Sequence, residues 1–178
     1  MDIAFLYESF LEHRSVCTDT RKVKKDDLFF ALKGPNFNGN IYAEKALELG
    51  ASFVVVDEAA VVKDDRYILV DDVLTALQQL ANLHRRTLGM PILAITGSNG
   101  KTTTKELVNA VMSKKYKTYA TKGNLNNHIG IPLTLLAMDE SVEFGIVEMG
   151  ANHQREIASY CAIVEPNYGL INNVGKAH

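Results

Sequence analysis

The sequence predicts an α/β protein in which a small N-terminal α/β domain is followed by a truncated P-loop domain built on a parallel sheet. Two observations lead to this prediction. Short apolar runs alternate along the chain with segments whose apolar residues recur at helical spacing. A glycine-rich segment, residues 97–100, lies between one of these runs and a helical segment, as in phosphate-binding loops.

The first domain is predicted from an alternation of strands and helices within residues 1–88. Strands are expected at residues 28–32, 52–56 and 67–70, and a helix at residues 41–49 that stops at Gly50. A longer helix over residues 72–88 ends at Gly89, and Pro91 prevents its continuation. We therefore place the domain boundary after residue 88.

The second domain, residues 89–178, alternates strands with helices more regularly. Strands are expected at 92–95, 118–120, 144–147 and 168–171, and helices at 102–113, 132–138 and 153–161. This order is typical of a parallel sheet with crossover helices. Because a doubly wound sheet needs helices on both faces and only a few residues follow the last strand, we expect the domain to be truncated and the natural protein to be longer.

Composition excludes several classes of protein. Apolar residues make up 47% of the 178 residues, which argues against disorder, and a net charge of −2 argues against a general nucleic-acid-binding surface. No apolar run approaches the ~20 residues that span a bilayer, and the N-terminus carries no basic signal-peptide region. Cys17 and Cys161 lie far apart in the sequence and form no C-x-x-C motif, which favours buried or idle thiols in a reducing compartment. We expect a cytoplasmic protein without a nucleic-acid partner and without membrane insertion.

The strongest chemical signal follows the strand at residues 92–95, where a glycine loop leads through a Lys-Thr pair into a helix. The ammonium of Lys101 is expected to reach the β- and γ-phosphates of a nucleotide, and the hydroxyl of Thr102 to bind Mg²⁺. Only two residues separate Gly97 from Gly100, whereas the common loop has four before its Gly-Lys pair. A simple glycine turn before a helix is the alternative. The predicted nucleotide-binding residues are Gly97, Ser98, Asn99, Gly100, Lys101, Thr102 and Thr103.

Two further residues follow predicted strands. Glu148 comes directly after the strand at residues 144–147, and ligands of open α/β sheets bind at the carboxyl ends of strands. Its side chain is expected either to face the glycine loop of residues 97–100, here called the phosphate loop, and hold Mg²⁺, or to be solvated. The spacing favours neither alternative. His178 lies beyond the last strand; a neutral imidazole can bind a divalent ion, but its position alone carries no information.

Amide side chains are concentrated in residues 123–130, which include Asn124, Asn126 and Asn127. Because asparagine favours turns, a purely structural loop is one interpretation. The other is a polar loop that hydrogen-bonds a substrate rich in amide and carboxylate groups.

Several segments, in the same order along the chain, resemble the Mur ligase family. Residues 95–106 look like its ATP-binding loop, including the shortened glycine spacing, and residues 123–136 and 148–153 resemble one member of the family. Residues 18–21 and 27–34 resemble its UDP-binding N-terminal domain. The resemblance covers almost the whole chain.

This resemblance implies a three-domain, ATP-dependent amide ligase of peptidoglycan synthesis, with ATP and Mg²⁺ as cofactors. The terminal carboxylate of a UDP-N-acetylmuramoyl-tripeptide would attack ATP to form an acyl phosphate, and the amine of D-alanyl-D-alanine would then displace phosphate. This chain would hold the first domain and about half of the second. We therefore expect it to be inactive alone, and the protein to be monomeric.

The resemblance also implies roles for individual residues. Lys101, Glu148 and His178 would be catalytic; Thr102 and Glu148 would hold one Mg²⁺, and His178 would help to hold a second. The implied UDP-site residues are Thr18, Asp19, Thr20 and Arg21, with Arg21 or Lys33 pairing with pyrophosphate charge, and the residues facing the muramoyl-peptide are Asn124, Asn126 and Asn127.

Two positions depart from the family's pattern. Arg155 stands where the family usually has glycine, which puts the start of the following helix in question. Asn38-Gly39-Asn40 stands where the family often has Asp-Gly-His, which weakens any inference about contacts of that turn.

Two other classes of function remain open. Another Mur ligase or a folylpolyglutamate-synthase-like ligase would share the glycine loop, and binding of tetrahydrofolate would distinguish the latter. A non-catalytic nucleotide-binding protein would need only the loop and not the remainder of an ATP domain.

Overall fold

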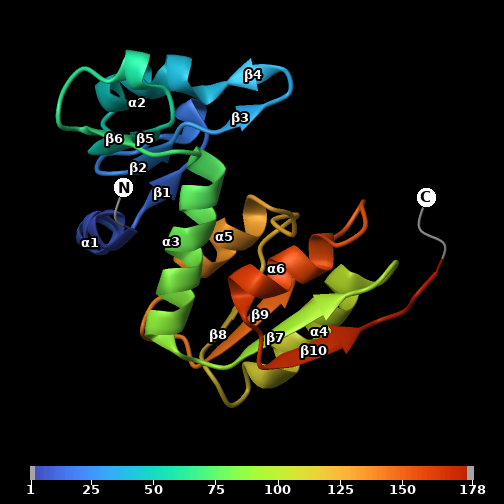
Figure 1. The fold of residues 1–178 in the computed structure, drawn as a ribbon. Coiled ribbons are helices and arrows are strands. Elements are labelled where there is room, and N and C mark those ends of the chain that lie inside the picture. The colour runs from blue at the N-terminus through green and yellow to red at the C-terminus, as the bar shows by residue number, and fades with distance from the viewer. Residues whose placement is uncertain (1–2, 176–178) are drawn as a thin grey trace. The chain divides into compact units, whose positions relative to one another are not determined.

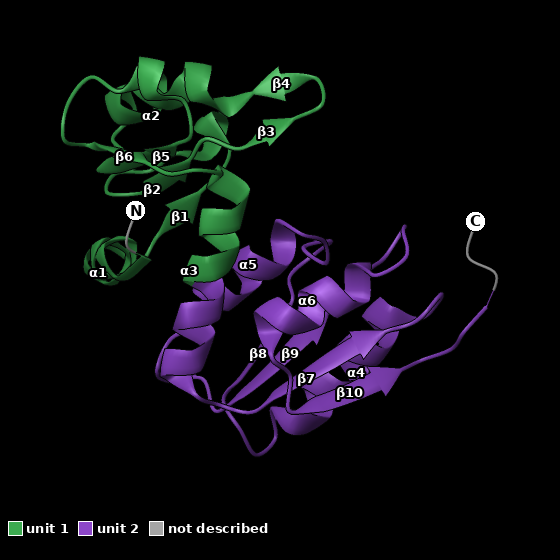
Figure 2. Ribbon diagram, viewed as in Figure 1, with its two compact units in different colours: residues 1–80 green, residues 81–178 purple. Residues whose placement is uncertain are grey.

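The computed structural model describes residues 3–175, which form two compact units. Figure 2 shows the first unit, residues 1–80, in green and the second, residues 81–178, in purple. The division falls inside one long helix, α3 (Val73–Leu88). Among the residues that the structure describes, no helix is both long and apolar enough to cross a membrane.

The first unit is built on a four-stranded parallel sheet in the order β1-β2-β5-β6 (Figure 1). Its elements are α1 (Ile3–His13), β1 (Val16–Cys17), η1 (Thr20–Lys22), β2 (Leu28–Phe30), β3 (Lys33–Gly34), β4 (Phe37–Asn38), η2 (Gly39–Tyr42), α2 (Ala43–Glu48), β5 (Phe53–Val56), η3 (Ala59–Val61), β6 (Tyr67–Leu69) and the start of α3. Every residue of β2 is buried, and so are the last three of β5. Strands covered on both faces explain why these segments are continuously apolar rather than alternating.

A short antiparallel hairpin, β3–β4, projects from this sheet. Gly39 follows β4 and lies against the backbone of the chain that leaves β2. A Cβ atom at this position would lie 2.3 Å from the carbonyl oxygen of Leu32, so only glycine fits this close approach.

The second unit holds a four-stranded parallel sheet in the order β10-β7-β9-β8 (Figure 1). Its elements after α3 are β7 (Ile92–Thr96), α4 (Lys101–Met112), β8 (Thr118–Ala120), α5 (Gly130–Leu136), β9 (Phe144–Glu148), α6 (Glu156–Val164) and β10 (Tyr168–Ile171). Because all four strands are parallel, the loops that follow β7, β9 and β10 leave from the same edge of the sheet.

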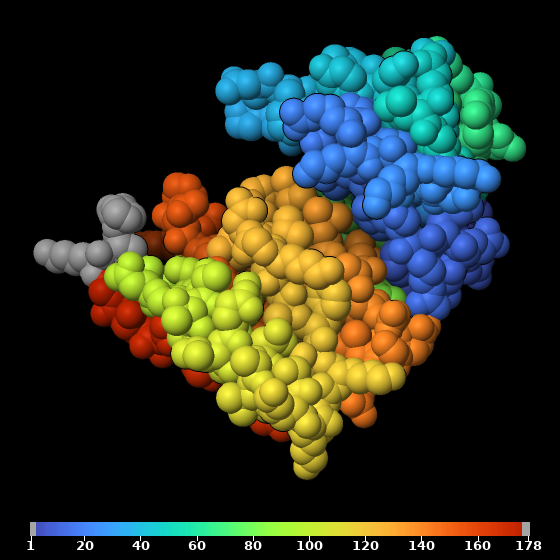
Figure 3. All heavy atoms as spheres, turned by 180° about the vertical axis from the view of Figure 1, so that it is seen from behind, coloured from blue at the N-terminus to red at the C-terminus, as the bar shows by residue number. Residues whose placement is uncertain are grey.

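Three segments of the second unit expose large apolar side chains, among them the segment after β10, where Val174 is 90% exposed. On α4, Leu107 and Val111 are 64% and 70% exposed, and Figure 3 shows this yellow-green helix at the surface of the unit. On the edge strand β10, Tyr168 and Ile171 are 59% and 67% exposed.

The α/β fold with parallel sheets is confirmed, and most elements lie within a few residues of their predicted positions. The helix expected from residue 153 begins instead at Glu156. The Glu156 carboxylate accepts the N–H groups of Asn152 and His153, and Arg155 adopts a φ of 70°, outside the helical region. Strand β1 and the hairpin β3–β4 were not predicted, because pieces of two residues are too short to carry a period. Helix α1 was also not predicted, although it has 11 residues and its buried Leu6 and Phe10 are four positions apart, as on one face of a helix.

Candidate functional site

The loop between β7 and α4 turns at two glycines and leads directly into the helix. Gly97 and Gly100 adopt φ values of 141° and 75°, which side chains disfavour. The backbone N–H of Thr104 donates to the carbonyl of Gly100, four residues earlier, and this is the first backbone hydrogen bond of helix α4. The N–H groups of residues 101–103 therefore lie in the first turn, where a helix has no partners of its own and attracts negative charge.

The ammonium of Lys101 lies over its own loop. Its Nζ donates to the carbonyl oxygens of Gly97, at 2.7 Å, and Ser98, at 3.3 Å. The side chain is partly buried and reaches back across the loop rather than out into solvent. This places a positive charge beside the loop. Thr102 and Thr103 lie on the first turn of α4, and both residues are exposed.

Glu148 ends β9, which pairs directly with β7. In the register of the sheet Glu148 lies opposite Ile95, two residues before the loop begins. The residue is only 2% exposed. Its Oε1 accepts a hydrogen bond of 2.8 Å from Asn126, whereas its Oε2 is buried and has no hydrogen-bond partner. The solvated interpretation of Glu148 is thereby excluded.

An unpaired, buried carboxylate oxygen is costly unless a cation or a donor reaches it. Glu148 therefore fits the metal-binding role expected of it, and Thr102 offers a hydroxyl oxygen, which is a ligand type that Mg²⁺ accepts. The third expected ligand, His178, lies outside the described residues. Within residues 3–175 no cluster of three or more His, Cys, Asp or Glu side chains could hold a metal ion.

The three asparagines of residues 123–130 have different local contacts. Asn126 is bound to Glu148, and its carbonyl accepts from the N–H of Gly150. The Asn127 Oδ1 accepts from the N–H groups of Ile129 and Gly130, at the start of α5. Asn124 is exposed. The loop is thus built partly by its own amides, and Asn126 links it to the acidic residue of the site.

Sequence reasoning gave no role to Asn172 and Asn173, which follow β10. Both contact the phosphate loop: Asn173 Oδ1 accepts from the N–H of Asn99, and Asn172 Nδ2 donates to the Asn99 carbonyl. Their position after a strand, at the same edge of the sheet as the loop, was the only signal in the sequence that could have indicated this.

In the first unit, the predicted UDP-site residues line one pocket. It has a volume of about 490 Å³ and is lined by Thr18, Asp19, Thr20, Arg21, Phe29, Leu32, Phe37, Gly39 and Tyr42. Asp19 caps the 3₁₀ helix η1 by accepting from the N–H of Arg21, and its carboxylate also pairs with the Arg21 guanidinium at 2.7 Å. These bonds to Arg21 lower the pKa of Asp19 to about 2.

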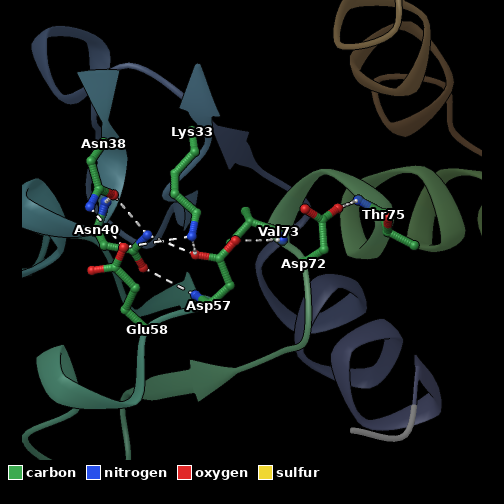
Figure 4. Close-up of polar contacts among 8 residues, drawn as sticks. All are labelled: Lys33, Asn38, Asn40, Asp57, Glu58, Asp72, Val73 and Thr75. Carbon is green, nitrogen blue, oxygen red and sulfur yellow. Dashed lines mark hydrogen bonds and ion pairs between the residues drawn. The ribbon is translucent and has the colours of Figure 1, made fainter. Parts of the chain in front are cut away.

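Lys33 does not line this pocket. Its ammonium pairs with Asp57 at 2.8 Å and with Glu58 at 3.6 Å. Figure 4 shows Lys33 pointing toward these carboxylates, with Asn38 and Asn40 beside them. The structure therefore gives Lys33 a position in an ion-pair network of the first unit.

Asp57 is the centre of this network. It accepts from Asn40 Nδ2 at 2.8 Å and from the backbone N–H of Val73, the first residue of α3, at 3.3 Å (Figure 4). Burial raises the pKa of Asp57, but the Lys33 ammonium and these hydrogen bonds outweigh it, so that the pKa lies below its usual value. The network joins the hairpin to the start of the long helix.

Two family models match this chain. The model of the Mur ligase middle domain matches residues 95–178, and that of the Mur ligase family catalytic domain matches residues 12–85. This chain belongs to the Mur ligase family. The phosphate loop and Glu148 lie in the middle-domain match of this Mur ligase chain, and the pocket beside Arg21 lies within the other.

Among its relatives are two enzymes named UDP-N-acetylmuramoyl-tripeptide–D-alanyl-D-alanine ligase. The one from Bacillus subtilis is 44% identical over 97% of this chain and 38% of its own length, and the one from Escherichia coli is 39% identical over 92% and 36%. This Mur ligase chain therefore spans less than two fifths of these relatives.

Solved structures with the same fold carry the name MurF. MurF from Acinetobacter baumannii is 35% identical with a TM-score of 0.85, covering 92% of this chain and 36% of its own. MurF from Thermotoga maritima in complex with ADP is 33% identical with a TM-score of 0.86, covering 94% and 39%.

Proposed function

We propose that this chain is part of an ATP-dependent ligase that adds D-alanyl-D-alanine to UDP-N-acetylmuramoyl-tripeptide in peptidoglycan synthesis. Residues 1–88 would bind the UDP-sugar substrate, and residues 89–178 would form the first part of the ATP-binding domain. The names of the relatives support the choice of substrates. The ADP complex of a relative supports a nucleotide at the loop after β7.

One observation carries this proposal: the buried Oε2 of Glu148, which has no partner, lies at the strand end next to the phosphate loop. In the proposed reaction the N–H groups of residues 101–103 and the Lys101 ammonium hold the phosphates of ATP. Glu148 and Thr102, with His178 at a second position, would hold Mg²⁺, which neutralises charge on the transferring phosphoryl group.

The remaining residues would position the acceptor substrate. The pocket beside η1 would receive the UDP group, with Arg21 close to the pyrophosphate. Asn124, Asn126 and Asn127 would face the muramoyl-peptide. Asn126 also donates to Glu148, and Asn127 also accepts from an N–H group at the start of α5. With the tripeptide carboxylate held next to the γ-phosphate, catalysis consists mainly of positioning and charge neutralisation.

The proposed enzyme is cytoplasmic and monomeric, without a nucleic-acid partner or membrane insertion. Two free cysteines, Cys17 and Cys161, support a reducing compartment. Because the chain spans 38% of the B. subtilis relative, we propose that it does not ligate by itself. Repeated turnover of D-alanyl-D-alanine by the purified chain would contradict this part of the proposal.

Calorimetric titration with ADP in the presence and absence of Mg²⁺ tests the nucleotide site. We expect saturable binding that Mg²⁺ strengthens in the wild type. In Lys101→Ala the binding should be at least about tenfold weaker, because a charge-assisted contact to phosphate is worth about 1.5–3 kcal/mol. Lys114→Ala, which removes an exposed lysine beyond the far end of α4, is the matched control. Equal binding by all three proteins would contradict the proposal.

A non-catalytic nucleotide-binding protein is the second candidate. The 490 Å³ pocket of the first unit favours the ligase over it, because a protein that binds only a nucleotide at the loop has no use for a second substrate pocket. Absence of any UDP-ligand binding by the folded chain would favour this second candidate.

A further inference from the structure

The phosphate loop of the second unit forms several hydrogen bonds with the segment that follows β10. Ser98 N–H donates to the carbonyl of Asn173 at 3.2 Å, and Asn99 N–H donates to the side-chain Oδ1 of Asn173 at 3.0 Å. In the opposite direction, the Asn99 carbonyl accepts from Asn172 Nδ2 at 3.0 Å and from Asn173 Nδ2 at 3.3 Å. Both polar groups of the Asn99 backbone are therefore bound by this pair of asparagines.

Two further contacts enclose the loop. Asn172 Oδ1 accepts from the hydroxyl of Thr104 at 2.9 Å, which ties the pair to the first turns of α4. The Ser98 hydroxyl bonds with the backbone of Gly175, as acceptor at 2.9 Å and as donor at 3.2 Å. The backbone N–H of Asn172 itself donates to Thr96, at the end of β7.

The two glycines of the loop lie close to this pair. A Cβ atom on Gly97 would lie 2.9 Å from Asn172 Cβ and 3.0 Å from the backbone nitrogen of Asn173. A Cβ atom on Gly100 would lie 2.7 Å from Asn172 Nδ2. At Gly97 this close packing adds to the positive φ in requiring glycine, whereas at Gly100 the positive φ is the main reason, because the end of the Asn172 side chain can move.

We propose that Asn172 and Asn173, the asparagine clamp, are positioning residues that set the phosphate loop in its binding shape. The clamp occupies the N–H groups of Ser98 and Asn99, and this leaves the N–H groups of residues 101–103 as the donors for phosphate. The inference rests on the proposed function only in taking a nucleotide phosphate as the ligand.

The clamp leads to a measurable effect in the nucleotide-free chain. Amide hydrogen exchange followed by NMR should find the Asn99 N–H protected in the wild type. Asn173→Leu, which removes the acceptor, should lose that protection, whereas Asn173→Asp, which keeps an acceptor oxygen, should retain it. Free exchange of the Asn99 amide in the wild type would overturn the clamp, whatever the nucleotide experiments show.

The second measurement is ADP binding by calorimetry with Mg²⁺. We expect Asn173→Leu to bind ADP about tenfold more weakly, equivalent to about 1.4 kcal/mol, with the unfolding midpoint and the affinity for a UDP ligand unchanged. Asn36→Leu, an exposed asparagine of the first unit, is the matched control. Unchanged ADP affinity in Asn173→Leu, despite loss of Asn99 protection, would overturn the positioning role.

The two proposals fail in different ways. A folded wild-type chain that binds no ADP would contradict the proposed function, and the clamp would then be judged by amide exchange alone. If the wild type and Asn173→Leu bound ADP equally well, the clamp would be overturned and the proposed function would remain intact.

Discussion

Replacing Glu148 by glutamine should have opposite effects on stability and on metal-dependent binding. The carboxylate is 2% exposed, and one of its oxygens has no partner. A buried, unsatisfied polar atom costs about 1–3 kcal/mol, and a neutral amide is cheaper to bury than a charged carboxylate. Glutamine retains an oxygen that can accept from Asn126. We therefore expect Glu148→Gln to stabilise the metal-free, nucleotide-free chain by about 1 kcal/mol.

The same substitution should remove the stabilisation by ligand. A ligand present at 100 times its dissociation constant adds about 2.7 kcal/mol to the stability of a protein that binds it only when folded. For a chain of this length, 1 kcal/mol corresponds to about 2–4 °C in the midpoint of unfolding. Wild type should therefore gain several degrees from ADP with Mg²⁺ relative to ADP with a chelator, and Glu148→Gln should not.

Thermal unfolding followed by circular dichroism measures both effects in one series. Glu143→Gln is the matched control, because Glu143 is an exposed carboxylate of the same unit, whose Oε2 accepts from the N–H of Lys117. If Glu148→Gln were less stable than wild type in the chelator and kept the full Mg²⁺-dependent shift, the interpretation of Glu148 as a strained metal ligand would be wrong.

Three further substitutions test separate parts of the structure. Arg155→Gly should stabilise the chain by up to about 1 kcal/mol in urea denaturation, because glycine relieves the left-handed strain at φ 70°; a loss of stability would refute this. Lys105→Met should destabilise by about 1–3 kcal/mol, since the buried ammonium donates to the Thr121 carbonyl at 2.7 Å, and an unchanged urea midpoint would show that this bond contributes nothing. The lowered pKa of Asp57 contributes stability that is present above the ordinary carboxyl value of about 4 and is lost as pH falls through the lower folded-state value. Asp57→Asn should therefore lose less stability than wild type between pH 5 and pH 2, and equal losses would refute the role of the Lys33 pair.

Much of the fold could be predicted from the sequence because its signals are local. Strand β5 is a continuous apolar run, and strand β9 is apolar up to its last residue, Glu148. Helix α3 is followed by a glycine with φ 68° and, two residues later, by a proline. Such patterns depend on residues within one element. Predictions were poorest for β1, β3 and β4, which have two residues each and exist only because of their neighbours in space.

The order of strand β7, glycine loop and helix α4 was predictable, because it depends on neighbouring residues of the chain; the nucleotide-binding role of residues 97–103 stays a prediction. Burial and partners could not be read from the sequence. Glu148 was equally consistent with a solvated side chain, and only the fold shows that it is buried and bound to Asn126. The contacts of Asn173 with the loop join residues 74 positions apart, which no local pattern encodes.

The departure at Arg155 shows how the two kinds of information combine. From the sequence, an arginine at a position where the family usually has glycine put the helix start in question. The structure shows the reason for the glycine: the residue before α6 adopts a φ of 70°. The fold is kept, and the strain is carried by the arginine backbone.

Calorimetric titration of the folded chain with UDP-N-acetylmuramoyl-tripeptide, with tetrahydrofolate in parallel, tests the central claim most directly. The account predicts saturable binding of the UDP-peptide, weakened in Arg21→Ala because Arg21 lines the pocket, and no binding of tetrahydrofolate. A chain that is demonstrably folded, binds tetrahydrofolate and ignores the UDP-peptide would contradict it.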